Sequence, residues 1–161
     1  MKWIRDLFLL FLVIFGVAWY QAKDLPKGQI RSLEGIDLQG EILSLDAFQG
    51  EPVLVHFWAT WCPICSLEEG SIQSISEDHN VLSVALSSGE SDEIRHYMTN
   101  NGLDFPVIVD DLGELSESWG VSGVPATFVV DGSGRIKNAS VGYTTELGMR
   151  ARLWWYSRAD N

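Results

Sequence analysis

A pair of cysteines separated by two residues constrains the fold of this chain more than any other feature. Cys62 and Cys65 are its only cysteines, and they closely follow the apolar run Val53–Trp58 (VLVHFW). A run of this kind is typical of a strand that is covered on both faces. From Ile64, which lies between the two cysteines, apolar residues recur at helical spacing at Leu67, Ile72 and Ile75. The sequence therefore predicts a buried strand, a turn that carries the cysteines, and a helix that starts there.

The start of a helix favours the thiolate form of a cysteine. Backbone N–H groups and the positive end of the helix dipole would converge on Cys62 and stabilise its thiolate, which is the nucleophilic form. Pro63 suits the first helical turn, where its missing N–H is no loss. At this spacing Cys62 and Cys65 can close a disulfide without large movement of the chain. We predict that Cys62 attacks a disulfide and that Cys65 resolves the mixed disulfide, in either net direction.

Other uses of a close cysteine pair fit the sequence less well. A structural zinc site needs four ligands, and His56, His79 and His96 lack the spacing that would complete one. Covalent haem attachment requires a histidine directly after the second cysteine, where Ser66 stands. An inert structural disulfide would close too small a loop to stabilise the fold much. We therefore expect redox work without a metal or organic cofactor.

Two further hypotheses from other classes of protein stay open. In a copper-handling module, the two soft thiolates of the cysteine pair would hold Cu(I). In a scaffold protein, only a peptide-binding groove would be needed, and the cysteines would be dispensable. Nucleic acid is not an expected partner, because 22 acidic residues against 11 basic ones give the chain a formal net charge of −11.

The first twenty residues indicate export or anchoring. Residues 7–20 (LFLLFLVIFGVAWY) carry no charge, and basic residues precede them. The run has fourteen residues where a membrane span typically needs ~20, so a cleaved signal peptide is the rival interpretation. Trp3 on one side and Trp19 with Tyr20 on the other suit the two membrane interfaces. The same bulky aromatic residues do not suit a cleavage site, which favours an uncleaved anchor.

The chain is expected to divide into three parts. Residues 1–21 are an N-terminal membrane anchor or signal segment, residues 22–34 a linker, and residues 35–161 a single folded domain. An anchor in the inner (cytoplasmic) membrane would place the domain in the periplasm or outside the cell, with the membrane as a partner through the N-terminal segment.

The remaining elements alternate between strands and helices before a final hairpin. A hairpin turns at Gln39–Gly40, and a helix after Ser91 ends at Gly102. The other predicted strands are residues 81–86, 105–109, 126–130 and 135–139, with a short helix over residues 112–119. Leu147, Ala151 and Trp154 predict the core face of a last helix. Early alternation requires parallel strands and the late hairpin adds antiparallel ones, so we predict an α/β fold with a mixed sheet and helices on both faces.

Two segments carry a family resemblance. Residues 53–65 (VLVHFWATWCPIC) resemble the active-site segment of the thioredoxin superfamily, and residues 123–128 (GVPATF) resemble its loop with a cis-proline. Within that superfamily the chain is most similar to membrane-anchored TlpA-like proteins, in particular the protein disulfide oxidoreductases related to suppressor of copper sensitivity D. Residues 102–107 and 143–146 are similar to that group as well. The resemblance extends over about residues 30–158.

The resemblance implies a thioredoxin-like three-layer fold and a function. The protein would exchange disulfides with protein thiols outside the cytoplasm, in a disulfide-reducing, isomerising or copper-stress pathway, and a membrane-embedded thiol partner would recharge it. Pro125 would be cis and would present the Val124 backbone to a substrate strand, unless it is an ordinary trans proline at the start of a strand. Trp61, Pro63 and Ile64 would complete the substrate-binding site.

The chain departs from its relatives at two positions. Thioredoxin carries a buried acid six residues before its first cysteine, and His56 stands there in this chain. His56 could carry a proton, because an imidazole titrates near neutral pH, or it could be a histidine of the core with its hydrogen bonds satisfied. The cytochrome-maturation branch has Pro-Glu-Thr-Phe where this chain has Pro125, Ala126, Thr127 and Phe128. A dedicated role in reducing apocytochrome is therefore not expected.

Overall fold

The computed structural model describes residues 3, 6, 9, 28 and 31–159. Most of the predicted anchor and most of the predicted linker therefore lie outside the described residues. Among the helices that are described, none is long and apolar enough to cross a membrane.

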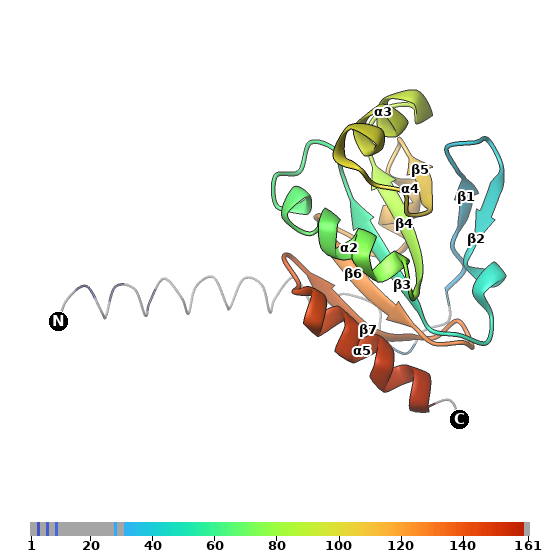
Figure 1. Ribbon diagram of the computed structural model, residues 1–161, viewed down its shortest axis with the longest axis vertical. Helices are drawn as coiled ribbons and strands as arrows, with labels where there is room; N and C mark the ends of the chain where they lie inside the picture. The colour runs from blue at the N-terminus through green and yellow to red at the C-terminus, as the bar shows by residue number, and fades with distance from the viewer. Residues whose placement is uncertain (1–2, 4–5, 7–8, 10–27, 29–30, 160–161) are drawn as a thin grey trace.

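A five-stranded mixed sheet forms the centre of the fold (Figure 1). Its strands lie in the order β5-β4-β3-β6-β7. Their bounds are Val53–Trp58 for β3, Asn80–Leu86 for β4, Val107–Asp110 for β5, Ala126–Val130 for β6 and Ile136–Val141 for β7. The pairs β3–β4 and β4–β5 are parallel, whereas β3–β6 and β6–β7 are antiparallel. The mixed sheet predicted from the order of elements is confirmed.

Helices cover both faces of this sheet. Within residues 31–159 the α-helices are α2 (Glu69–Ser76), α3 (Ser91–Asn101), α4 (Glu114–Ser118) and α5 (Glu146–Ala159), and the 3₁₀ turns are η1 (Leu45–Phe48) and η2 (Cys65–Leu67). One core cluster holds buried residues of α2, α3 and α5 together with both cysteines. The other core cluster lies on the opposite face, where α4 and the chain before β3 pack. The three-layer prediction is thus confirmed.

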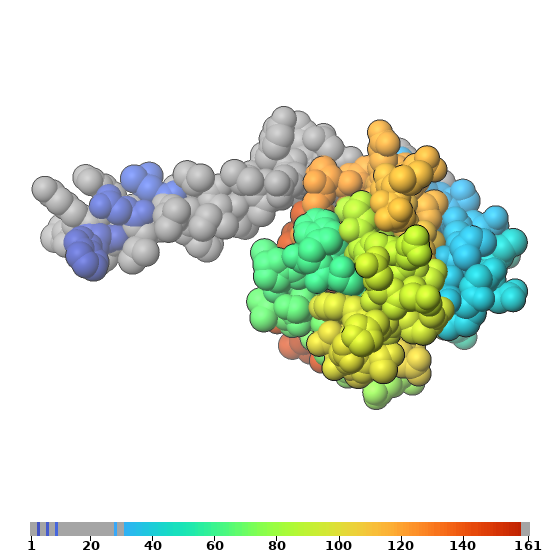
Figure 2. Space-filling view, turned by 90° about the horizontal axis from the view of Figure 1, so that it is seen from above, coloured from blue at the N-terminus to red at the C-terminus, as the bar shows by residue number. Residues whose placement is uncertain are grey.

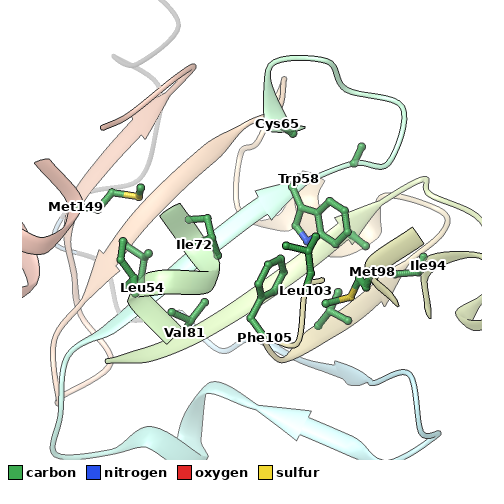
Figure 3. Packing of buried hydrophobic residues seen from close by; sticks show 14 of the residues in the cluster. Leu54, Trp58, Cys65, Ile72, Val81, Ile94, Met98, Leu103, Phe105 and Met149 are labelled. Carbon is green, nitrogen blue, oxygen red and sulfur yellow. The ribbon is translucent and has the colours of Figure 1, made fainter. Parts of the chain in front are cut away.

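β3 supplies both core clusters because its side chains alternate between the two faces. Leu54 and Trp58 belong to the cluster that contains the cysteines, and Val55 and Phe57 belong to the other. All six residues of β3 are buried. Figure 3 shows Trp58 packed with Leu103 and Phe105 near Cys65, so the strand that leads to the cysteines is held rigidly in the core.

The predicted N-terminal hairpin is present beside the main sheet. β1 (Glu34–Ile36) pairs antiparallel with β2 (Ile42–Ser44), and a bridge from Asp37 to Ile108 joins the hairpin to β5. The hairpin lies on the opposite side of the domain from the segment that carries the cysteines (Figures 1 and 2).

Two helical faces differ from the prediction. On α5, Met149 and Leu153 are buried, whereas Leu147, Ala151 and Trp154 are exposed. The helix carries apolar residues on two faces, so periodicity alone could not identify the one that packs. On the face predicted from Ile64 onward, Ile72 and Ile75 are buried as predicted, but Ile64 and Leu67 are exposed. These two residues precede α2, so the spacing of a regular helix does not apply to them.

Candidate active site

The two cysteines form a disulfide on the loop that follows β3. The Cα atoms of Cys62 and Cys65 are 5.3 Å apart, so the predicted closure of the pair without large chain movement is confirmed. The side chain of Cys65 is completely buried, and Cys62 retains slight exposure. An incoming group can therefore approach Cys62 but not Cys65.

A backbone amide contacts the exposed member of the pair. The amide of Cys65 donates to Sγ of Cys62 over 3.2 Å. The predicted helix start is wrong in detail, because the cysteines lead into the 3₁₀ turn η2 and the regular α-helix begins only at Glu69. Support for a thiolate at Cys62 therefore comes from this amide of the turn and not from the first turn of a regular helix.

The loop that carries Pro125 lies against the disulfide. The Val124–Pro125 peptide bond is cis, as the resemblance implied. The carbonyl oxygen of Val124 is 3.7 Å from Sγ of Cys62. In the disulfide this sulfur carries no proton, so the approach is a contact, and the reduced thiol could donate to the same oxygen. Antiparallel pairing of β6 with β3 brings these segments together although they are 62 residues apart.

Exposed apolar residues flank Cys62 in its loop, and the loop of Val124 lies against its sulfur. Trp61, Pro63 and Ile64 are exposed, Val124 is half-buried, and Pro125 is buried. The structure thus brings together all five residues that the sequence assigned to substrate binding. Around a nearly buried sulfur, such a rim offers apolar contact to a polypeptide chain.

Two serines at the end of β4 hold the segment that precedes Cys62. The indole Nε1 of Trp61 donates to the carbonyl oxygen of Ser87 over 2.9 Å. The amide of Thr60 donates to Oγ of Ser88 over 3.1 Å. Ser87 has a φ of 43°, an uncommon conformation for a residue with a side chain. Sequence analysis missed both serines, although polar residues directly after a buried parallel strand are a signal for a site.

His56 is buried in the middle of β3. Its Nδ1 lies 3.2 Å from Oγ1 of Thr127 on the neighbouring strand β6. Burial lowers the pKa of His56 to about 3, so its imidazole is neutral near neutral pH. Of the two roles that the sequence left open, this environment favours a core histidine, because a neutral imidazole with so low a pKa accepts a proton poorly.

Glu68 is a buried acid that sequence analysis missed. It follows Cys65 by three residues, and its amide donates to the carbonyl oxygen of Cys65 over 2.9 Å. Its side chain is completely buried, and Oε1 accepts a hydrogen bond from the amide of Thr144. Oε2 has no partner among the described residues. Burial raises the pKa of Glu68 to about 7, and the hydrogen bond from Thr144 opposes this rise only in part.

The sequence did contain a signal for Glu68. An acidic residue directly before the buried face of α2, in the turn that carries the dithiol, conflicts with the apolar pattern of that face. The partner of Glu68 could not be identified from this signal, because Thr144 lies 76 residues away. Among the described residues, no group of three or more His, Cys, Asp or Glu side chains could hold a metal ion.

Comparisons with known proteins agree with this geometry. A family model described as Redoxin matches residues 21–152. A thioredoxin-like protein of Haemophilus influenzae is 32% identical over 152 residues, which are 93% of this chain and 90% of that protein. Sporulation thiol-disulfide oxidoreductase A of Bacillus subtilis is 24% identical, with 88% of this chain and 92% of that protein covered.

A solved structure has a similar fold. The secreted thiol-disulfide isomerase of Corynebacterium glutamicum superposes with a TM-score of 0.74 at 24% identity, covering 81% of this chain and 86% of that chain. The thioredoxin-like α/β fold is thereby confirmed. With the match of the family model, it places the disulfide of Cys62 and Cys65 on a known redox scaffold. The chain belongs to the Redoxin family and is a thiol–disulfide oxidoreductase.

Proposed function

We propose that the protein exchanges disulfides with protein substrates outside the cytoplasm, with Cys62 as the nucleophile and Cys65 as the resolving thiol. The observation that carries this assignment is the different burial of the two sulfurs: Cys65 is sealed, while Cys62 borders the loop of Val124 and the exposed rim. A substrate strand that lay along Val124 would bring its own sulfur to Cys62.

The exchange takes two steps, over which the sulfur bonds, protons and electrons balance. In the reducing direction, the Cys62 thiolate attacks a substrate disulfide, a mixed disulfide forms, and the second substrate sulfur leaves as a thiolate and takes up a proton. Cys65 then loses its proton and attacks the Cys62 sulfur, which releases the first substrate sulfur. Two electrons pass from the dithiol to the substrate. The same steps in reverse oxidise a substrate dithiol.

Glu68 is the proton acceptor for Cys65 in this proposal. Resolution needs a base inside the protein, because Cys65 has no contact with solvent. Glu68 is adjacent in the same turn, its Oε2 is free of partners among the described residues, and its pKa of about 7 lets it exchange a proton near neutral pH. His56, with a pKa of about 3, is a much weaker base.

The proposed location is the outer side of the cytoplasmic membrane. Residues 7–20 would anchor the chain, as the sequence predicts, and the domain would face the periplasm or the cell exterior. A membrane-embedded thiol partner would recharge the dithiol there, as in the TlpA-like proteins that the chain resembles. An oxidising compartment supplies the substrate disulfides that such an enzyme needs.

We further propose that the enzyme acts in a copper-stress pathway. The similarity to proteins related to suppressor of copper sensitivity D supports it. Disulfide exchange and Cu(I) binding by the same thiolates make different predictions. Exchange requires turnover of a protein disulfide such as insulin, and copper handling requires Cu(I) retained by the reduced protein after purification.

A Cys65→Ser variant of the full chain in its native host tests the assignment. Resolution is blocked, so substrate proteins should accumulate as mixed disulfides on Cys62, and their identification would name substrates and the recharging partner together. A Cys62→Ser variant is the matched control and should trap nothing. Trapping on Cys65 alone would reverse the roles of the two cysteines, and equal trapping by both variants would contradict the assignment of separate roles.

A further inference from the structure

The outward face of α5 carries an apolar stripe that the fold does not use. Leu147, Ala151, Trp154 and Trp155 recur at the spacing of one helical face, and we call them the outer stripe. Leu147 is 79% exposed, Trp154 51% and Trp155 64%. Met149 and Leu153 already fix α5 on the core from its other side. The outer stripe therefore has no role in folding of the described domain.

The chain that leads to the N-terminal segment is fixed beside this helix. The amide of Gly28 donates to the carbonyl oxygen of Ile136 over 2.7 Å, and Nη1 of Arg135 donates to the carbonyl oxygen of Gly28 over 3.1 Å. The next residue of β7, Lys137, accepts a hydrogen bond from the hydroxyl of Tyr156 on α5 over 3.4 Å. Gly28 and the last turns of α5 thus meet at the same end of β7.

The sequence between Gly28 and the apolar run is short. Residues 21–27 are seven residues, which span at most about 25 Å when fully extended. If residues 7–20 lie in the membrane, the end of β7 and the adjoining part of α5 cannot be farther than that from the membrane surface. The domain itself cannot diffuse away from the bilayer, and α5 belongs to the part that lies nearest to it.

The chemistry of α5 suits an anionic lipid surface. Arg150 pairs with Glu146 and Asp78, and the helix carries two further arginines, Arg152 and Arg158, whereas the chain as a whole has a net charge of −11. The guanidinium of Arg158 lies 4.3 Å from the ring centroid of Trp154. Tryptophan and arginine side chains prefer the headgroup level of a bilayer, and acidic surfaces are repelled from it.

We propose that the outer stripe of α5 rests in the interfacial layer of the membrane. This proposal depends on the membrane anchor proposed above, and it adds the orientation of the folded domain relative to the membrane. The chain enters α5 beside the active site, because Glu68, in the turn that carries Cys65, is bonded to Thr144 just before the helix. A docked α5 would therefore hold the dithiol close to the bilayer surface, where a membrane-embedded thiol partner can reach Cys62.

Quenching of tryptophan fluorescence in lipid tests this orientation. The full chain is reconstituted in nanodiscs of phosphatidylcholine and phosphatidylglycerol, with or without bromine on the acyl chains. Three proteins are compared: the unchanged chain, a W3F/W19F variant and a W154F/W155F variant. Subtraction isolates the emission of the N-terminal pair and of the α5 pair. We expect brominated lipid to reduce the emission of both pairs.

The outcomes separate the two proposals. Loss of emission from the N-terminal pair alone would overturn the docking of α5 and leave the anchor intact. No loss from either pair would overturn both. Shielding of the α5 pair from aqueous acrylamide without quenching by bromine would mean that a second copy of the chain covers the outer stripe, and this also overturns membrane docking.

A matched pair of leucine variants tests whether the stripe itself is responsible. Leu147 is 79% exposed and Leu112, which lies outside α5, is 81% exposed. Leu147→Ser should weaken the quenching of the α5 pair by brominated lipid, because it removes apolar surface from the stripe. Leu112→Ser should leave the quenching unchanged. Equal effects of the two variants would overturn the proposal.

Discussion

The amide of Thr144 donates a hydrogen bond to one carboxyl oxygen of Glu68, while the other oxygen has no partner among the described residues. Only one of the two carboxyl oxygens of this buried acid thus has a hydrogen-bond partner. The acid lies in the turn that also carries Cys65. The bond keeps the side chain in place, and the burial of the unpaired oxygen keeps its charged form unfavourable. Stability and turnover should therefore both depend on the protonation of Glu68.

Stability of the oxidised protein should fall as the pH rises from about 4.5 to about 7. Burial raises the pKa of Glu68 from an ordinary value of 4.5 to about 7, so the protonated form is favoured by folding. The contribution is complete below pH 4.5 and is lost progressively as the pH rises from 4.5 to about 7. The difference amounts to a free energy of unfolding on the order of 3 kcal/mol. Urea denaturation at pH 5 and pH 8 measures it.

Glu68→Gln is the control for this effect, because it keeps an acceptor for the Thr144 amide but cannot ionise. Its free energy of unfolding should change less between the two pH values than that of the unchanged protein. An equal change in both proteins would show that Glu68 ionises freely in the folded state. Turnover of insulin by the variant should lose its pH dependence near 7 as well.

His56 should matter for acid stability and not for turnover near neutral pH. Burial lowers its pKa from 6.5 to about 3, so folding favours the neutral imidazole. This stability is present above pH 6.5 and is lost as the pH falls towards 3, by an amount on the order of 4 kcal/mol. His56→Asn, which keeps a polar atom near Thr127, should show a smaller loss between pH 6.5 and 3.5.

Insulin reduction at pH 7 distinguishes the two roles of His56. The Asn variant should retain its rate within about twofold, because the neutral imidazole exchanges no proton there. His96→Asn, on the surface of α3, is the matched control and should change neither property. A large loss of rate in the His56 variant alone would restore the proton-carrier hypothesis.

Trp61→Phe should weaken the binding of protein substrates. The variant keeps the ring in the apolar rim but loses the hydrogen bond from its indole to Ser87. A hydrogen bond of this kind contributes about 1 kcal/mol to holding Trp61 in place, so we expect KM for insulin to rise by up to roughly fivefold with kcat little changed. Ser87→Ala keeps the carbonyl acceptor and should leave KM as it is. A fall in kcat alone would instead indicate a role of Trp61 in the chemical step.

Two glycines should respond in opposite directions to the same substitution. A Cβ at Gly132, in the turn between β6 and β7, would lie 2.6 Å from the carbonyl carbon of Gly50. Gly132→Ala should therefore destabilise the protein by about 1 to 3 kcal/mol. A Cβ at Gly70 in α2 would meet no atom within 4 Å apart from its own helix backbone, and Gly70→Ala should stabilise by roughly 0.5 to 1 kcal/mol. Chemical denaturation at one pH compares both, and a shift of equal sign would contradict the packing at Gly132.

The elements of this fold could be predicted because their signals are local. The buried run Val53–Trp58 is β3, and the helix that stops at Gly102 ends there with that glycine in a left-handed conformation. The start of α2 and the packed face of α5 were predicted wrongly. Both depend on which of several apolar side chains finds a partner in the core, and a single helix does not determine that choice.

The sequence by itself determined the chemistry of this protein. The order of elements, the pair Cys62 and Cys65, and the proline that precedes β6 identify the fold and the reacting sulfurs, because each depends on residues that are neighbours in the chain. Only the tertiary structure decided the surroundings of those sulfurs. Hydrogen bonds join Glu68 to Thr144, 76 residues away, and Trp61 to Ser87, 26 residues away. The sulfur of Cys62 contacts the carbonyl oxygen of Val124, which is 62 residues away. Such contacts arise from the packing of the whole sheet, and the pKa of Glu68 follows from the burial that this packing produces.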